Sequence, residues 1–374
     1  MLAHVIHRLV ILCLSALLGI GLLQPALAVT QHWDPNTSAG IQHGDGAWNT
    51  ADGNWSSLTN GSNPNNAWTN DNNAQFGKSH AAGSSIVTVT GAVTAGQIII
   101  TNGTYTVVIT NGGQVLTGGT PAPSVVGWYG SNNSMGVVGG AGIRSGWEVG
   151  GSGASTQNLS VGVGAALATN NTLRIDGGGV TGGAVVTNVA SCTLGSGSAY
   201  NQMVIANGGL IAIAGGTTIG GFTNQVQIVG GVGAVSRWDN GASTLTINGV
   251  GDSFIVTNGG LMTLSGTATV GGTSNTVLIV GGAGVTSMWD NGAGGVTMGG
   301  TLGNQFIIDG QGVADCAIAT NTGTLIIGSA SEVGDSVIVS NKGVLYADGP
   351  IRIGTGSATE SDASLVIALG GIVR

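Results

Sequence analysis

The chain has 374 residues and a formal net charge of −8, and charged residues make up only 6% of it, against roughly 25% in a soluble globular domain. The acidic balance excludes nucleic acid as a partner, because binding to phosphates requires clustered Lys and Arg. The 72 glycines follow no Gly-x-y period and accompany only six prolines, which excludes collagen. Short alternating runs of Val, Ile and Thr exclude a disordered chain.

The N-terminal segment is typical of a secretory signal peptide. A weakly basic start that includes Arg8 precedes an apolar run at 9–23, and residues 26–28 supply the small residues of a cleavage site. We therefore expect residues 1–28 to be removed and the mature protein to be exported, extracellular or at the bacterial outer surface. No second run of eighteen apolar residues follows, so the sequence predicts no transmembrane anchor.

The segment 29–120 is rich in Trp, Asn, Ser and Gly. A stack of repeats exposes an apolar cross-section and an unpaired strand edge at its end, so a bulky element must cover that end. We predict that this segment forms a Trp-rich N-terminal cap and the first coils, with strands at 86–90, 97–100 and 104–109. The tryptophans that we expect to build the cap are Trp33, Trp48, Trp55 and Trp68.

The segment 121–374 is a glycine-rich repeat region. Residues 201–251 align with residues 252–302 with identity at 23 of 51 positions, which indicates an internal duplication. A shorter unit recurs nine times: a start residue, usually polar, then apolar residues at the second and fourth following positions, then a Gly-rich turn. The start residues are Asn133, Asn171, Asn201, Asn224, Asp252, Asn275, Asn304, Asp335 and Ala363.

This alternation predicts strands with one buried face. A unit of this size cannot bury its apolar face alone, so the units must stack, and each strand must pair in parallel with the same strand of the next unit. The sequence therefore predicts an all-β protein, a right-handed parallel β-helix (β-solenoid) with a Trp-rich N-terminal cap. We expect Val226 and Val277 to share one core column two coils apart. We also expect Cys192 and Cys316, five coils or about 24 Å apart, to remain unpaired.

Short motifs near the start of the mature chain resemble the opening of autotransporter-associated β-strand repeat proteins. These motifs are W-D-P-N at 33–36, G-A-W-N-T at 46–50, G-N-W at 53–55, A-W-T-N at 67–70 and A-Q-F-G at 74–77. The later N-G-G and V-G-G coils are similar to the same group. The resemblance implies an exported β-helix like an autotransporter passenger, with a structural or adhesive role. No translocating β-barrel follows the coils in this sequence, so we expect either a released protein or a truncated reading frame.

The strongest enzyme-like feature is a repeated W-D-N-G corner. Asp239 and Asp290 occupy equivalent corners two coils apart, about 10 Å, which is just beyond the upper end of the carboxylate separation in inverting glycosidases. Asp-Asn-Gly is also a strong turn sequence, and Trp238 and Trp289 can cover the corner. No His or Lys accompanies either Asp as a second acid–base or charge-stabilising group. We therefore interpret both acids as turn formers.

The remaining motifs predict no catalytic, cofactor or metal site. Asp309 and Asp315 form a second pair of acids, similarly unaccompanied. G-K-S at 77–79 lacks the first glycine of a P-loop, and G-G-G-V-T-G at 177–182 is interpreted as a solenoid corner, so we expect no nucleotide binding. The histidines of the mature chain have no i, i+4 or Cys partner and are interpreted as loop residues; they are His32, His43 and His80.

The sequence therefore favours a non-catalytic, exported surface β-solenoid with a structural or adhesive role. Its expected partners are extracellular polysaccharide or cell-surface components. One alternative is a polysaccharide lyase or glycoside hydrolase on a β-helix scaffold, but a lyase needs clustered cations to neutralise a uronate, and the chain has few. A third hypothesis is carbohydrate binding through the four cap tryptophans, although buried packing is the favoured interpretation of those rings.

Overall fold

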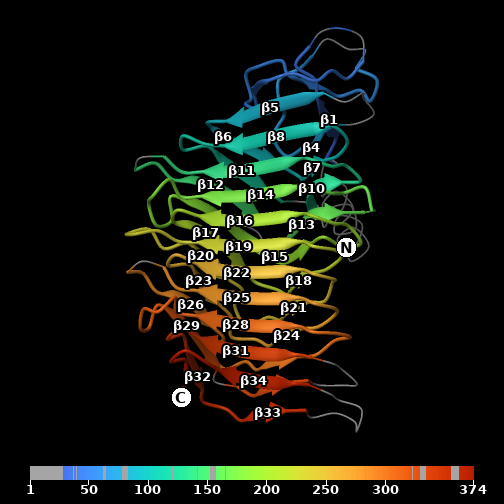
Figure 1. The fold of residues 1–374 in the computed structure, drawn as a ribbon. Helices are drawn as coiled ribbons and strands as arrows, with labels where there is room; N and C mark the ends of the chain where they lie inside the picture. The colour runs from blue at the N-terminus through green and yellow to red at the C-terminus, as the bar shows by residue number, and fades with distance from the viewer. Residues whose placement is uncertain are drawn as a thin grey trace, which may run out of the picture.

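The computed structural model describes residues 28–36, 38, 40–61, 65–77, 83–118, 122–140, 142–151, 157–164, 166–282, 284–321, 323–328, 334–354 and 362–374. These residues form 35 strands and no helix. The strands stack along one axis in an elongated body, with one coil of the chain above the next (Figure 1). The all-β prediction is therefore confirmed.

One face of the stack is a 12-stranded sheet whose strands all pair in parallel. Its strands, in order along the axis, are β2 (Gly46–Ala47), β5 (Ser84–Val89), β8 (Thr104–Ile109), β11 (Ser134–Val138), β14 (Thr172–Asp176), β16 (Gln202–Ala206), β19 (Gln225–Val229), β22 (Ser253–Thr257), β25 (Thr276–Val280), β28 (Gln305–Asp309), β31 (Ser336–Ser340) and β34 (Ser364–Ile367).

The other strands form a 23-stranded sheet with two parallel stacks, which the long strand β15 joins. The first stack contains β6 (Ala92–Ala95), β9 (Gln114–Thr117), β12 (Ser145–Val149), β15 (Ala184–Leu194), β17 (Gly209–Ile213), β20 (Arg237–Asp239), β23 (Leu261–Thr263), β26 (Ser287–Asp290), β29 (Ala317–Asn321), β32 (Val344–Ala347) and β35 (Ile372–Val373).

The second stack contains β1 (Thr30–Trp33), β3 (Trp55–Ser56), β4 (Asn73–Phe76), β7 (Ile98–Ile100), β10 (Ser124–Trp128), β13 (Gln157–Val163), the end of β15, β18 (Thr217–Ile219), β21 (Leu245–Ile247), β24 (Ala268–Val270), β27 (Val296–Met298), β30 (Leu325–Ile327) and β33 (Ile351–Ile353). Only β1 and β3 pair antiparallel among these named strands. Each coil thus adds one strand to each of three faces, which is the arrangement of a parallel β-solenoid.

The hydrophobic core lies between the three faces and follows the predicted register. Val226 pairs with Phe254, and Phe254 pairs with Val277, so Val226 and Val277 share one column two coils apart, as predicted. The apolar pairs of the first eight repeat copies are buried. In the last copy Leu365 is half-buried and Ile367 is 53% exposed, because the structure places a neighbouring strand on only one side of β34.

The start residues of the repeats form a ladder of hydrogen bonds in the corner that leads into the 12-stranded sheet. In the seven start residues from Asn133 to Asn304, the backbone N–H donates to the side-chain Oδ1 of the start residue in the next coil, at 2.7 to 3.0 Å. The side chains are buried, so they satisfy backbone groups that water cannot reach. The ladder residues are Asn133, Asn171, Asn201, Asn224, Asp252, Asn275, Asn304 and Asp335.

Asp252 and Asp335 replace an amide in this ladder. At a neighbouring rung, the Asn275 Nδ2 donates to the carbonyl oxygen of Gly249 at 2.9 Å, and an ionised carboxylate has no such donor. The Oδ2 atoms of Asp252 and Asp335 are buried, and no donor lies in hydrogen-bonding geometry to either atom. Burial raises the pKa of Asp252 above its usual range, although hydrogen bonds from Asn224 oppose that shift.

Glycines from the neighbouring turns make room for the ladder. A Cβ at Gly162 would lie 2.0 Å from the Asn201 side chain, and a Cβ at Gly195 would lie 2.2 Å from the Asn224 side chain. Both glycines also have a positive φ, 62° and 76°, which favours glycine over other residues. The backbone conformation and the close approach of the amide therefore both require glycine at these corners.

The two described cysteines lie far apart along the axis. Cys192 is in β15, and Cys316 immediately precedes β29, which is five strand pairings away through β17, β20, β23 and β26. The predicted separation of five coils is confirmed, and both thiols are unpaired and buried. Burial raises the pKa of Cys192 to about 12, so this thiol is unreactive.

An aromatic cluster lies at the N-terminal end of the stack. The indoles of Trp33 and Trp55 meet edge to face with centroids 5.3 Å apart, and those of Trp48 and Trp68 do so at 5.2 Å. Phe76 packs against three of these rings. All five side chains are buried, so the cluster hides a large apolar area in one place.

Candidate functional site

The structure places Asp239 and Asp290 at equivalent corners of one face. Asp239 ends β20 and pairs with Thr263 of β23, and Thr263 pairs with Asp290 at the end of β26. The two acids are therefore two coils apart, as predicted. They border a shallow open groove of about 190 Å³, whose lining residues are Arg237, Asp239, Gly241, Thr263, Leu264, Ser265, Asp290 and Gly292.

Both carboxylates act within their own turns. Asp239 Oδ1 accepts a hydrogen bond from the Gly241 N–H, and Asp290 Oδ1 accepts one from the Gly292 N–H, both at 3.1 Å. This is the geometry of an Asx-turn. Asp290 Oδ1 also accepts a hydrogen bond from the Thr320 hydroxyl at 2.8 Å. The prediction that these acids form turns is confirmed.

A cation accompanies one of the acids. Arg237 lies two residues before Asp239 and contacts its Oδ2 at 2.9 Å. The expectation that no charge-stabilising group accompanies Asp239 is therefore wrong, since strand alternation places residues i and i+2 on the same face. Because a guanidinium stays protonated, Arg237 cannot exchange a proton with a substrate. The groove therefore offers two carboxylates and one fixed cation, without a second acid–base group.

The neighbouring tryptophans belong to the core and do not cover the corners. Trp238 and Trp289 are fully buried, and each packs edge to face against Phe254 with ring centroids 5.6 and 5.4 Å apart. The prediction that these indoles cover the outside of the turns is wrong. Alternation along the strand points the indole inward wherever the adjacent Asp points outward.

Asp309 and Asp315 are also parts of turns. Asp309 Oδ1 accepts hydrogen bonds from the Gln311 N–H at 2.8 Å and from the Asn341 side chain at 3.0 Å. Asp315 is exposed in a left-handed conformation with φ 56°. These contacts describe two corner residues and no shared substrate position.

The histidines and glycine motifs form no ligand site in the described part of the chain. His32 lies in β1, His43 packs against Tyr105 at 5.3 Å, and no group of three His, Cys, Asp or Glu among the described residues could hold a metal. Residues 177–182 form the corner between β14 and β15, as predicted. Lys78, Ser79 and His80 lie outside the described residues.

The four tryptophans expected in the cap cannot bind sugars through their faces as they stand. Three of them are fully buried and Trp68 is 3% exposed. The hypothesis of a carbohydrate platform on these rings is therefore wrong, and the expected buried packing is what the structure has. The rings reach this arrangement because four indoles bury more apolar area by meeting one another than by facing water.

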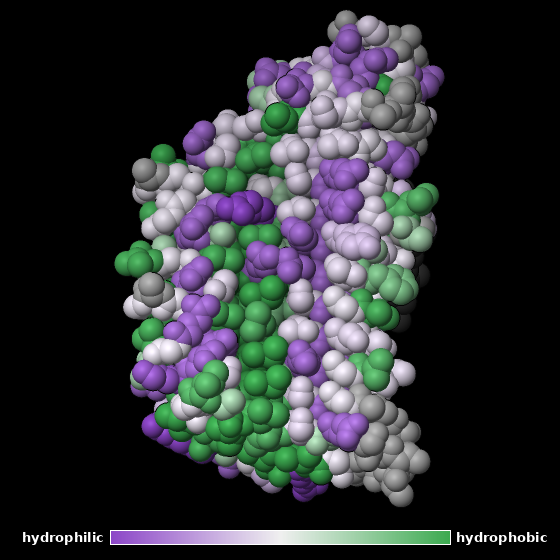
Figure 2. All heavy atoms as spheres, in the orientation of Figure 1, coloured by the Kyte–Doolittle hydropathy of each residue, from purple (hydrophilic) through white to green (hydrophobic). Residues whose placement is uncertain are grey.

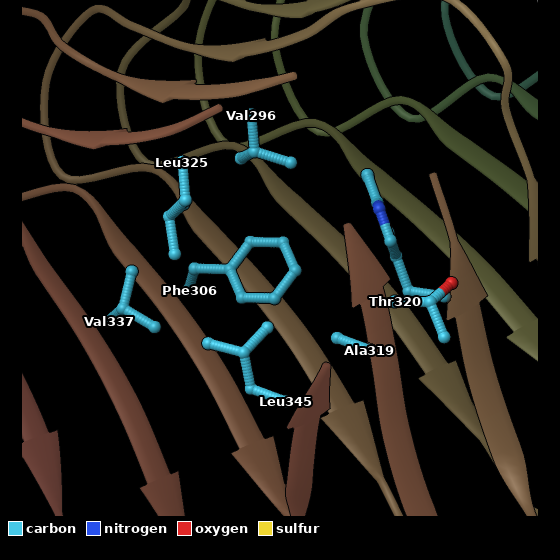
Figure 3. A pocket seen from close by; sticks show the side chains of 8 residues that line it. Val296, Phe306, Ala319, Thr320, Leu325, Val337 and Leu345 are labelled. Atoms are coloured by element: carbon cyan, nitrogen blue, oxygen red, sulfur yellow. The ribbon is translucent and has the colours of Figure 1, made fainter. Parts of the chain in front are cut away.

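A small cavity lies inside the core near the C-terminal coils (Figure 3). Its volume is about 10 Å³, which is close to the minimum needed for one water molecule. The eight lining side chains are Trp289, Val296, Phe306, Ala319, Thr320, Leu325, Val337 and Leu345. It is a gap in the packing and no ligand pocket.

The outer face of the 12-stranded sheet carries an apolar column. Outward-facing residues of five consecutive strands pair with one another in register. We call this column the aliphatic stripe; it consists of Ile255, Leu278, Ile307, Ile338 and Val366. Figure 2 shows the stripe as a run of hydrophobic atoms along the C-terminal half of this face. Apolar columns of this kind commonly mark contact surfaces.

These features define an elongated parallel β-solenoid with extended, weakly charged outer faces. The chain is distantly homologous to an autotransporter adhesin, "Adhesin BmaC autotransporter" of Brucella suis biovar 1 (strain 1330), with 29% identity over 327 residues. The match covers 84% of this chain and 8% of the relative, so the chain spans a small part of that protein. No family model matches the chain, and no solved structure matches it. The described residues contain no helix that is long and apolar enough to cross a membrane.

Proposed function

We propose that this chain is a non-catalytic, exported β-solenoid with an adhesive or structural role at the bacterial outer surface. The observation that carries the proposal is the long solenoid with an apolar stripe on its outer face. The relative that it resembles is an adhesin, and the N-terminal segment 1–28 has the pattern of a signal peptide. Extracellular polysaccharide and cell-surface components are the proposed partners.

We also propose bounds for the segments of the chain, the handedness of the solenoid and the role of the N-terminal aromatic cluster. The chain divides into the signal peptide 1–28, a cap with the first coils at 29–120 and the repeats at 121–374. The solenoid is right-handed, because crossover connections between parallel strands are almost always right-handed. The N-terminal aromatic cluster caps the stack, because it lies where the first coil would otherwise expose an apolar cross-section.

Adhesion is the direct test of this function. Beads coated with the purified chain are expected to bind epithelial or bacterial cell layers in a saturable manner, and soluble chain is expected to compete. Beads coated with serum albumin give the background. Binding no greater than this background would contradict the adhesive role.

The alternative of a polysaccharide-active enzyme is tested at the Asp239 and Asp290 groove. The double variant Asp239→Asn, Asp290→Asn is expected to lose about 1 kcal/mol or less per site, because Asn can accept the same turn hydrogen bonds. Neither protein should release reducing ends or unsaturated products from acidic and neutral polysaccharides. Turnover by the wild type that disappears in the variant would establish the enzyme alternative.

A further inference from the structure

One tryptophan of the chain differs from all the others. The protein has eight tryptophans, and seven of them are buried; Trp128, at the end of β10, is 37% exposed. Its indole stacks on Tyr129, which is 53% exposed, with centroids 5.9 Å apart and planes 21° apart. The pair presents aromatic surface to solvent on the outside of the solenoid.

The backbone of the next coil approaches this pair closely. A Cβ at Gly164 would lie 2.8 Å from Trp128 Cδ1 and 3.2 Å from Tyr129 Cε1, and Gly164 has a φ of 112°. Tyr129 itself has a φ of 58°, which is uncommon for a bulky residue and costs about 1–2 kcal/mol. The Tyr129 N–H donates to the carbonyl oxygen of Val163 at 3.2 Å, so a hydrogen bond to the next coil supports this conformation.

Further exposed aromatic residues follow along the same corner. Tyr200 has a φ of 58° and is 57% exposed, and its N–H donates to the carbonyl oxygen of Phe222, which is 55% exposed. Phe222 continues through parallel bridges to Val250 and Thr273 in the next two coils. We call Trp128, Tyr129, Tyr200 and Phe222 the aromatic corner. It runs parallel to the solenoid axis, with about 4.8 Å from coil to coil.

The aromatic corner contains no charged residue. Segments 122–133, 160–172, 194–202 and 218–225, which form it, contain no Lys, Arg, Asp or Glu. The side chains that flank the rings are neutral amides and hydroxyls, among them the exposed Asn132 and Thr223. Acidic polymers need cations for charge-assisted hydrogen bonds, and this surface has none. A cationic polymer likewise finds no carboxylate in these segments.

We propose that the aromatic corner binds a neutral polysaccharide that lies along the solenoid axis, with Trp128 and Tyr129 as its main stacking platform. The electron-rich ring faces attract the C–H faces of sugar rings, and the flanking amides and hydroxyls bond the sugar hydroxyls. The coil at 163–170 has no aromatic residue, so Tyr200 lies two coils from Tyr129, and Phe222 lies in the next coil. A linear polymer along the axis would therefore meet the rings in two groups, separated by about 10 Å. This inference names the partner class of the proposed adhesive surface and rests on that function.

The fluorescence of the exposed Trp128 can be used to measure binding at the aromatic corner. Because the other tryptophans are buried, Trp128 dominates the fluorescence that acrylamide quenches in the full chain. Soluble neutral polysaccharides (a β-glucan, a mannan and an α-glucan) are titrated against the protein, with polygalacturonate and chitosan as charged comparators. At least one neutral polymer is expected to protect Trp128 from acrylamide, whereas the charged polymers are expected to leave it accessible.

Matched variants distinguish a loss of aromatic stacking from a loss of folding. Trp128→Ala is expected to weaken binding at least tenfold in isothermal titration, and Trp128→Phe is expected to retain part of the affinity because it keeps a ring. Val232→Ala, at an 88% exposed site on another corner, should bind like the wild type. Unchanged circular dichroism confirms that each variant is folded.

Several results would overturn the inference: no neutral polymer protects Trp128, only a charged polymer does, or Trp128→Ala binds as well as the wild type. Adhesion to cells distinguishes this failure from failure of the proposed function. If coated beads adhere but glycosidase treatment of the cells has no effect, the partner is not a glycosidase-sensitive polysaccharide, so the inference fails and the adhesive role stands. If the beads do not adhere, the adhesive role itself fails.

Discussion

Replacing Asn201 by leucine is expected to destabilise the solenoid by about 4 kcal/mol. Asn201 Oδ1 accepts hydrogen bonds from the backbone N–H and the Nδ2 of Asn171, both at 3.0 Å and both buried. Leucine has a similar size but no acceptor, so two donors lose their partner inside the protein, at about 1–3 kcal/mol each. Urea denaturation followed by circular dichroism measures the loss, and hydrogen exchange at the Asn171 amide locates it.

The matched control is Asn158→Leu. Asn158 is exposed in β13, where its Oδ1 accepts one hydrogen bond from Ser191. The same substitution there leaves no buried donor without a partner and should change stability by about 1 kcal/mol or less. Equal losses at both sites would mean that the ladder contributes nothing beyond the cost of an exposed leucine.

Asp252→Asn is expected to stabilise the protein at neutral pH, by about 1–3 kcal/mol. The amide restores a donor at a rung where the ionised carboxylate has none, and it removes a buried charge. The folded-state pKa of Asp252 is raised, so its neutral form supplies stability that is complete below the ordinary Asp pKa and is lost as pH rises through the raised value. The advantage of the variant should therefore be small at pH 4 and should grow to a plateau towards pH 7.

The difference in urea midpoint between variant and wild type, measured from pH 4 to 8, tests this sign. Because the difference is taken at each pH, contributions from the other acids cancel. Asp348→Asn serves as the control, since Asp348 is exposed and outside the ladder. An advantage of Asp252→Asn that is constant with pH, or greatest at low pH, would contradict the argument.

The register could be predicted from the sequence because strand alternation is a local property. The apolar residues that follow each start residue, and the coil count between Cys192 and Cys316, depend only on spacing along the chain. The Asx-turns at Asp239 and Asp290 are equally local, since each carboxylate bonds a backbone group two residues away.

The remaining features depend on contacts between coils. The sequence marks Asn201 as a polar start, but its burial and its bonds to Asn171 exist only once two coils are stacked. Composition also could not tell which tryptophans face water. Trp128 is exposed and Trp238 is buried because of where each strand meets its corner, and a period of two does not fix that position.

The duplication gives the protein a way to change its length. Its 51 residues correspond to two coils, since Asn201 pairs in the ladder with Asn224 and Asn224 with Asp252. Removing residues 201–251 would join Tyr200 to Asp252 and leave the ladder to continue from Asn171 in the same register. Unequal recombination between the two copies can therefore lengthen or shorten the rod in steps of about 10 Å, because the core residues keep their register. The length of the rod would then depend on the number of repeats within the gene.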